Sequence, residues 1–161
     1  MIHIRRAGAM DARDMAELLN AIIRKGGTTA LTDEITRDTI LTWFEQAPSN
    51  AIWHVAEDDA GQLFGFQYAK PHPNLPPEAC DIATFVKLGT TGLGIGAKLF
   101  EITKKAARDL GFEWINATIR ADNAGGLTYY QSRGFEDYAR LPNQRLADGQ
   151  IVDKISKRFD L

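Results

Sequence analysis

The stretch Thr90–Phe100, TTGLGIGAKLF, has glycines at positions 92, 94 and 96 and runs directly into an apolar, helix-like segment. A segment rich in β-forming residues, Ala83–Leu88 (ATFVKL), comes just before it. The start of a helix carries unpaired N–H groups and a partial positive charge, and glycine lets a ligand approach the backbone closely. A turn that binds nothing would need one glycine rather than three, so we favour a phosphate-bearing ligand at this turn.

The composition is that of an ordinary globular chain, and 161 residues are enough for a buried core, so we expect one domain over residues 1–161. A formal net charge of −2 does not indicate a nucleic-acid partner. No apolar run is long enough to cross a bilayer, and the N-terminal residues lack the apolar core of a signal peptide. Cys80 is the single cysteine, which favours a reducing, cytoplasmic setting, and we interpret it as a small strand residue rather than a nucleophile.

Apolar periodicity and turn residues predict an α/β fold with a mixed central sheet and the order β-α-α-β-β-β-α-β-α-β-β. The residues Asp58–Gly61 favour an antiparallel hairpin, whereas the strand, helix and strand around the glycines require a parallel pair. The predicted helices span residues 11–24, 36–46, 94–110 and 123–133, and the predicted strands span residues 2–6, 52–57, 63–70, 81–88, 113–119, 135–141 and 150–159.

A dinucleotide site is the first alternative for the glycine turn. Gly92–Ala97 fits the pattern G-x-G-x-x-[G/A], and Asp122 lies roughly where a ribose-binding acid is expected. That fingerprint normally opens its fold, however, whereas about ninety residues with two predicted helices and a hairpin precede it here. Too little chain follows for the rest of a doubly wound sheet, so we do not favour this alternative.

A second segment, Asn123–Phe135 (NAGGLTYYQSRGF), resembles the closing motif N-x-x-A-x-x-x-Y-x-x-x-G-F of the GNAT superfamily of N-acetyltransferases. Its asparagine, tyrosine, glycine and phenylalanine match, and Gly126 replaces the alanine. The upstream turn resembles the acetyl-CoA signature [Q/R]-x-x-G-x-[G/A] of the same family, with Gly94 and Gly96 at the two small positions. The predicted element order is also that of a GNAT fold, so the resemblance covers essentially the whole chain.

The resemblance implies acetyl-CoA as co-substrate, with Val86 contacting it through the main chain and offering an amide to the developing oxyanion. Asn123 is expected to reach the pantetheine arm, cap the following helix, or do both. Thr91 departs from the signature, which has Arg or Gln there, and Lys87 or Lys98 could compensate for the lost charge. The full expected acetyl-CoA set is Phe85, Val86, Lys87, Leu88, Thr91, Gly92, Leu93, Gly94, Ile95, Gly96, Ala97, Asn123 and Tyr130.

The resemblance also implies the catalytic groups. Tyr130 occupies the position of the tyrosine that protonates the departing thiolate in family members, with a core aromatic as the alternative. Asp81 lies where related enzymes carry a carboxylate base, although it could equally be an exposed carboxylate at a strand end. His72 or a water molecule remains open as the base. No cluster has metal-ligand spacing, so we expect no metal.

The N-terminal half resembles the phosphinothricin acetyltransferase group, which acetylates the α-amino group of amino acids and their analogues and tends to dimerise. Asn20, Thr28–Ala30 and Trp43–Glu45 carry this likeness. It implies a small-molecule amine acceptor and a homodimer. The expected acceptor-pocket residues are Thr29, Glu34, Trp43 and His72, with a plain surface carboxylate as the alternative for Glu34. Two other functions stay open, namely a CoA-binding regulatory module without turnover and a protein N-acetyltransferase.

Overall fold

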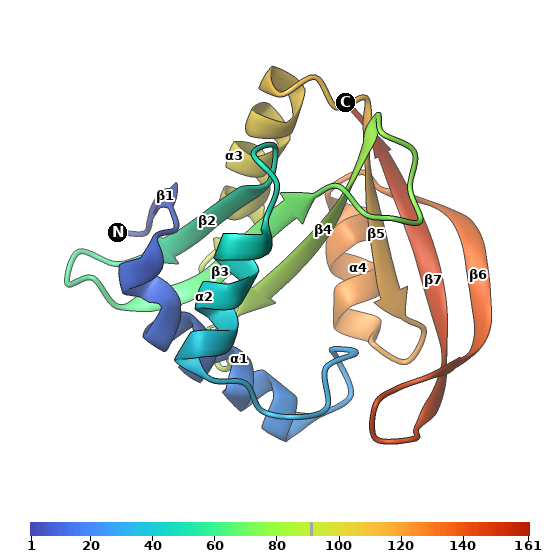
Figure 1. The fold of residues 1–161 in the computed structure, drawn as a ribbon, viewed down its shortest axis with the longest axis horizontal. Helices are drawn as coiled ribbons and strands as arrows, with labels where there is room; N and C mark the ends of the chain where they lie inside the picture. Colours follow the sequence, from blue (N-terminus) through green and yellow to red (C-terminus); the bar gives the residue numbers. More distant parts are fainter. Residues whose placement is uncertain (91) are drawn as a thin grey trace.

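The computed structural model describes residues 1–90 and 92–161, so the expectation for Thr91 lies outside the described residues. The fold is a seven-stranded mixed sheet with helices on both faces (Figure 1). The strands are β1 (His3–Arg6), β2 (Ile52–Glu57), β3 (Leu63–Lys70), β4 (Ala79–Val86), β5 (Trp114–Arg120), β6 (Glu136–Arg145) and β7 (Ile151–Asp160). The helices are α1 (Ala12–Lys25), α2 (Arg37–Gln46), α3 (Ile95–Asp109) and α4 (Ala124–Ser132), and a short 3-10 turn, η1 (Ala9–Asp11), precedes α1.

The predicted fold class and element order are confirmed, and two strands have bounds that differ from the prediction by more than one residue. β4 begins two residues earlier than predicted, at Ala79, and ends at Val86 rather than Leu88. β6 extends beyond the predicted end at Leu141, because a register shift between Leu141 and Gln144 accommodates Pro142 and Asn143 within the strand. Asn143 adopts a φ of 55°, a left-handed conformation that asparagine tolerates better than most residues.

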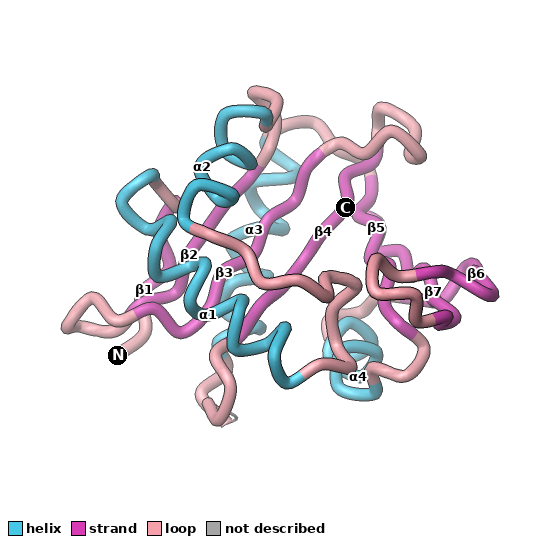
Figure 2. Tube along the Cα trace, turned by 60° about the horizontal axis from the view of Figure 1, so that its bottom comes forward, coloured by secondary structure: helices cyan, strands magenta, loops and turns pink. Residues whose placement is uncertain are grey.

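Two layers of helices cover the sheet. α1 and α2 pack on one face, in a core cluster built on residues such as Met15, Leu19 and Phe66. α3 and α4 pack on the other face, where Phe100 and Phe135 lie against buried residues of β4 and β5. Figure 2 shows α1 and α2 in front of the strands and α3 behind them. In the part of the chain that the structure describes, no helix has the length and apolar character needed to cross a membrane.

The sheet opens in its middle. The strand order is β1-β2-β3-β4-β5-β7-β6, and β4 and β5 form the parallel pair that the strand-helix-strand pattern predicted. This pairing covers only Ala79–Asp81 against Trp114–Asn116. Beyond it, residues 82–86 stay paired with β3 on one side, while β5 continues along β7. The two strands therefore diverge, leaving one edge of β4 without a strand partner among the described residues (Figure 1).

A glycine in β3 brings α3 close to this opening. A Cβ atom built on Gly65 would lie 2.9 Å from the backbone oxygen of Phe85 and 3.1 Å from Cγ2 of Ile95. Gly65 is paired with Val86, the last residue of β4, and Ile95 is the first residue of α3. The missing side chain therefore allows the start of α3 to sit beside the end of β4.

We predict that Gly65→Ala lowers the free energy of unfolding by about 1–3 kcal/mol, because the backbone oxygen of Phe85 cannot move cheaply. Gly8→Ala is the matched control, since no atom lies within 4 Å of its added Cβ and its φ of −135° suits alanine. Urea denaturation of both variants measures the effect. Equal stability of the two variants would contradict the packing role of Gly65.

Candidate active site

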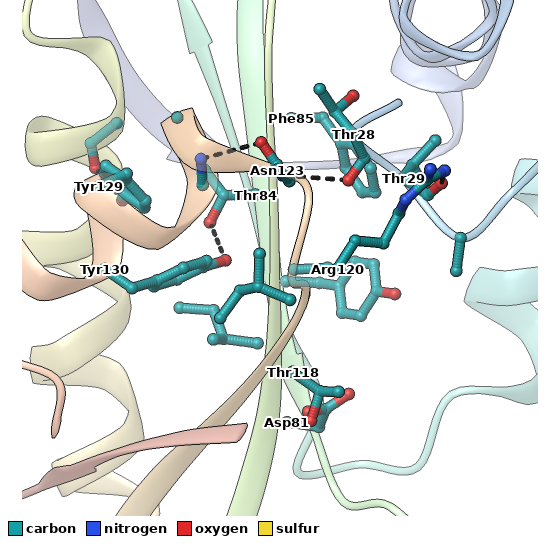
Figure 3. Close-up of a pocket in the computed structure, with 18 of the residues that line it drawn as sticks. Thr28, Thr29, Asp81, Thr84, Phe85, Thr118, Arg120, Asn123, Tyr129 and Tyr130 are labelled. Atoms are coloured by element: carbon teal, nitrogen blue, oxygen red, sulfur yellow. Dashed lines mark hydrogen bonds between the residues drawn. The ribbon is translucent and has the colours of Figure 1, made fainter. Parts of the chain in front are cut away.

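A groove of about 1300 Å³ occupies the opening between β4 and β5, and we call it the β4–β5 groove. Side chains alternate between the two faces of a strand. Thr84 therefore faces α4 and bonds Tyr130, while Asp81 faces the opposite side (Figure 3). On that side Asp81 accepts a hydrogen bond from Asn116. The groove thus joins two chemically different surfaces through the gap in the sheet.

The glycine turn forms the end of the groove at the start of α3. Gly92 and Gly94 have φ values of 88° and 67°, a left-handed conformation that is costly for residues with a Cβ atom. Gly94 is the N-cap of α3 and has no side chain to bond the first N–H groups, and the first turn holds no acidic residue. By contrast, Thr36 and Asn123 cap α2 and α4 with their side chains. The start of α3 thus leaves N–H groups for an anionic ligand.

Gly96 serves a different purpose, namely the contact between α3 and α4. A Cβ atom at Gly96 would lie 2.6 Å from the ring of Tyr129. The Tyr129 hydroxyl donates to the Gly96 carbonyl at 2.7 Å and lies 3.2 Å from the donor Nε2 of Gln67. Tyr129 therefore joins α4 to α3 and β3, which is a structural role.

Tyr130 lies beside β4 with its hydroxyl 2.9 Å from Oγ1 of Thr84. Gln67 Nε2 donates to the same Thr84 oxygen at 2.8 Å, and Gln67 is fully buried. The Thr84 hydroxyl accepts from Gln67 and still has its own hydrogen, which it can donate to Tyr130; in that arrangement the tyrosine hydrogen stays available to the groove. Burial raises the pKa of Tyr130 above its ordinary value, so the hydroxyl keeps its proton near neutral pH.

Asp81 lies on the opposite side of the sheet, at the closed end of the opening. Burial raises the pKa of its carboxyl group, while a 2.8 Å hydrogen bond from Asn116 Nδ2 and the positive charges of His72, Lys70 and Lys154 act in the opposite direction. The net direction is upward, which brings this carboxyl closer to the range in which a general base accepts a proton near neutral pH. Asp81 is thus not an exposed strand-end carboxylate.

The loop between α1 and α2 is tied to the end of β5. Arg120, which is 5% exposed, donates to the Thr29 carbonyl at 3.1 Å and forms a two-pronged ion pair with Asp122. Asn123 accepts from the Gly126 amide at 3.0 Å and donates to the Thr28 carbonyl at 3.1 Å. This loop therefore forms a wall of the groove (Figure 3).

The expected helix cap at Asn123 is present in this geometry. A Cβ atom at position 126 would lie 2.4 Å from Asn123 Nδ2, so the glycine that replaces the motif's alanine makes room for the amide. Asp122, considered above as a ribose-binding acid, is instead engaged by Arg120.

A family model described as the acetyltransferase (GNAT) family matches residues 14–135. The chain belongs to the GNAT family of acetyltransferases. YwnH of Bacillus subtilis strain 168, provisionally named a phosphinothricin acetyltransferase, is 24% identical over 163 residues, covering 98% of this chain and 94% of the relative.

Solved structures show the same fold. A GNAT superfamily phosphinothricin acetyltransferase from Sinorhizobium meliloti, in complex with AcCoA, has a TM-score of 0.89 at 21% identity, covering 99% of this chain and 88% of that chain. A ribosomal-protein-alanine N-acetyltransferase from Brucella melitensis also has a TM-score of 0.89, at 22% identity and 99% coverage of both chains. Since enzymes named for different acceptors share the fold, the fold alone does not select the acceptor of this GNAT protein.

Most residues expected to bind acetyl-CoA line the groove of this GNAT protein, and two described ones do not. Those that line it are Phe85, Val86, Leu88, Gly92, Gly94, Ile95, Gly96, Ala97, Asn123 and Tyr130. Lys87 lies outside, since its ammonium group stands 5.2 Å from the centre of the Phe64 ring. Leu93 is exposed and lies outside the groove. Lys98, which was considered together with Lys87 as a replacement for the missing charge at Thr91, is also exposed and outside the groove.

Three of the four residues expected at the acceptor pocket, Thr29, Trp43 and His72, line the groove. Glu34 does not, and its carboxylate is paired with Arg24 of α1 on the surface. The surface-carboxylate alternative therefore describes Glu34 better than a role in holding an ammonium group. Among the residues that the structure describes, no cluster of three histidine, cysteine or acidic side chains could hold a metal ion.

Sequence reasoning missed the polar groove residues Thr84, Asn116, Arg120 and Tyr138, and also Gln67, which bonds Thr84 from behind the groove lining. Gln67, Asn116 and Arg120 are buried polar residues within strand segments. A polar residue inside a strand with buried neighbours is the signal that could have pointed to them, because buried polar groups need specific partners.

Proposed function

We propose that the protein transfers an acetyl group from acetyl-CoA to the primary amine of a small, amino-acid-like molecule. The observation that carries this proposal is the groove itself. It places Tyr130 on one side of the divided sheet and the buried carboxyl group of Asp81 on the other. A thioester held between them would have a proton donor near its sulfur and a base near its attacking amine.

Acetyl-CoA suits the free edge of β4. Residues 82–86 offer backbone groups that no described strand pairs with on the side of β5, and an amide-rich pantetheine arm can pair with them as an added strand does. Its pyrophosphate would lie at the open start of α3, where the glycine turn leaves N–H groups available. The Sinorhizobium meliloti neighbour, solved in complex with AcCoA, supports acetyl-CoA as the ligand.

The proposed reaction is a direct transfer within a ternary complex. Asp81, directly or through water, takes a proton from the acceptor's ammonium group, and the freed nitrogen lone pair attacks the thioester carbonyl carbon. A C–N bond forms, the C–S bond breaks, and the Tyr130 hydroxyl gives its proton to the departing thiolate. Backbone N–H groups along residues 82–86, with Val86 as the candidate, stabilise the negative charge that develops on the carbonyl oxygen.

The charges of the groove favour an acceptor that carries an anionic group. Asp81 is the single acidic residue that the described part of the chain contributes to the lining, whereas Lys70 and Lys154 both act on it as positive charges. Arg120 is paired with Asp122 and contributes less. An amine bearing a carboxylate can place its ammonium group near Asp81 and its anion near the lysines, whereas a polyamine would meet repulsion. The cytoplasmic setting and the homodimer stay predictions of the sequence.

The experiment is a screen that measures the release of free CoA thiol. The full chain and acetyl-CoA are incubated with amino acids, polyamines, aminoglycosides and a peptide with a free N-terminus. We expect turnover with amino acids or their analogues and at least about tenfold lower kcat/KM with polyamines, a difference of about 1.4 kcal/mol. Turnover only with the peptide would contradict the small-molecule acceptor. Acetyl-CoA binding without turnover on any amine would instead indicate a regulatory module.

We predict that Tyr130→Phe lowers kcat by about 100-fold while KM for acetyl-CoA changes little, because only the proton donor to the leaving thiolate is lost. Steady-state kinetics with the best acceptor of the screen measures this. Thermal unfolding of the same variant is the control, since the aromatic packing against Phe135 is retained. An unchanged kcat would remove Tyr130 as the acid.

A further inference from the structure

A β-bulge in β6 directs a tyrosine into the groove. Asp137 is paired with Lys157 of β7 and Ala139 with the next residue back, Ser156, so Tyr138 is an extra residue on β6. Consecutive strand residues normally point to opposite faces, yet both Tyr138 and Ala139 line the groove. Bulges turn a side chain in this way and are common beside active sites.

Tyr138 reaches across β7 to the middle of the sheet. Its hydroxyl donates a hydrogen bond to Oδ1 of Asn116 on β5, and its ring packs edge-to-face on Trp114 with a centroid separation of 5.9 Å. Because Oδ1 of Asn116 faces Tyr138, the amide nitrogen faces the other way. There it donates to Oδ1 of Asp81 at 2.8 Å and to Oγ1 of Thr118 at 3.0 Å.

The hydrogen-bonding groups of the Asn116 side chain are all engaged. Both amide hydrogens have acceptors, and the oxygen has a donor. The side chain is 4% exposed, so an amide turned by 180° would place its oxygen against the Asp81 carboxylate with no water to compensate. The Asp81 carboxylate, which can only accept, thus selects the orientation in which Asn116 donates to it, and the Tyr138 hydroxyl holds the amide there by donating to its oxygen.

We propose that Asn116 and Tyr138 are positioning residues for Asp81, with Tyr138 fixing the Asn116 amide and Asn116 holding the Asp81 carboxyl group in place at the groove. The inference about the reaction rests on the proposed function, whereas the coupling of the three side chains does not. Under this proposal the β6–β7 hairpin, which forms the edge of the sheet, also takes part in proton transfer through Tyr138.

The other charged and titratable groups around Asp81 come from elements other than the strands that carry Asn116 and Tyr138. Lys70 and Tyr68 approach from β3, His72 from the following loop, Lys154 from β7 and Tyr130 from α4. Cys80 is the chain neighbour, and Tyr138 itself interacts electrostatically with the carboxylate. Burial favours the neutral acid, and the Asn116 bond favours the charged form. Removing that bond should therefore raise the pKa of Asp81 further.

The test is a carbon-13 NMR titration of the Asp81 carboxyl group in the full chain without ligand, with the resonance assigned by Asp81→Asn. We expect Asn116→Ala to raise the Asp81 pKa by about one unit, because a hydrogen bond to a charged group is lost. Tyr138→Phe, which keeps the ring on Trp114, should raise it by a smaller amount, because the Asn116 amide keeps its bond to Asp81 but loses the donor that fixes its oxygen. Thr103→Val, a buried change within α3, is the control and should leave the Asp81 pKa unchanged.

A double variant separates the two positioning residues. If Tyr138 acts through Asn116, adding Tyr138→Phe to Asn116→Ala should shift the Asp81 pKa no further. Equal shifts from Tyr138→Phe in both backgrounds, or no shift in either single variant, would overturn the proposal. Tyr138→Phe removes one hydroxyl from a half-exposed ring, so it keeps the test decisive if Asn116→Ala fails to fold.

Kinetics then links the coupling to the reaction. Once an acceptor is known, the pH profile of kcat/KM can be measured for the Asn116→Ala and Tyr138→Phe variants. The apparent pKa of its acid limb should rise by the same amount as the Asp81 pKa measured by NMR, with KM for acetyl-CoA unchanged. Failure of the wild-type chain to acetylate any amine would refute the proposed function and leave the NMR result standing. A pKa shift without movement of the acid limb would refute the catalytic role of the pair alone.

Discussion

The divergence of β4 and β5 after three paired residues is the constraint on which the site depends. A continuous sheet would bury both strands' backbone groups in hydrogen bonds and leave no passage between its faces. Here β5 continues along β7, and residues 82–86 keep β3 on one side only. The free edge of β4, the open start of α3 and the groove all follow from this separation.

The opening also separates the two residues that we propose as acid and base. Tyr130 comes from α4 and contacts Thr84 on one face, while Asp81, three residues earlier on β4, faces the other. Their environments differ accordingly. A chain of bonds from Gln67 through Thr84 orients the phenol, and the amide of Asn116 supports the carboxylate. Two polar networks on opposite sides of β4 therefore surround the residues proposed as acid and base.

Much of the fold and part of the site could be predicted from the sequence, because local chemistry encodes them. Glycines with positive φ, the Asn123 cap and apolar periodicity are properties of short segments. The missed features depend on residues distant in the chain. Nothing near Tyr138 in sequence indicates that a bulge turns it toward Asn116, 22 residues earlier. The pairing of Glu34 with Arg24 and the orientation of Lys87 toward Phe64 likewise follow from packing between elements.

The central claim is that acetyl-CoA occupies the opening with its thioester between Tyr130 and Asp81, and a crystal structure of the complex tests it most directly. We expect the pantetheine arm to pair with residues 82–86 of β4, the pyrophosphate to contact N–H groups at the start of α3, and the sulfur to lie within hydrogen-bond reach of the Tyr130 hydroxyl. A bound acetyl-CoA whose thioester lies outside the β4–β5 groove, or whose sulfur is remote from Tyr130, would contradict this account.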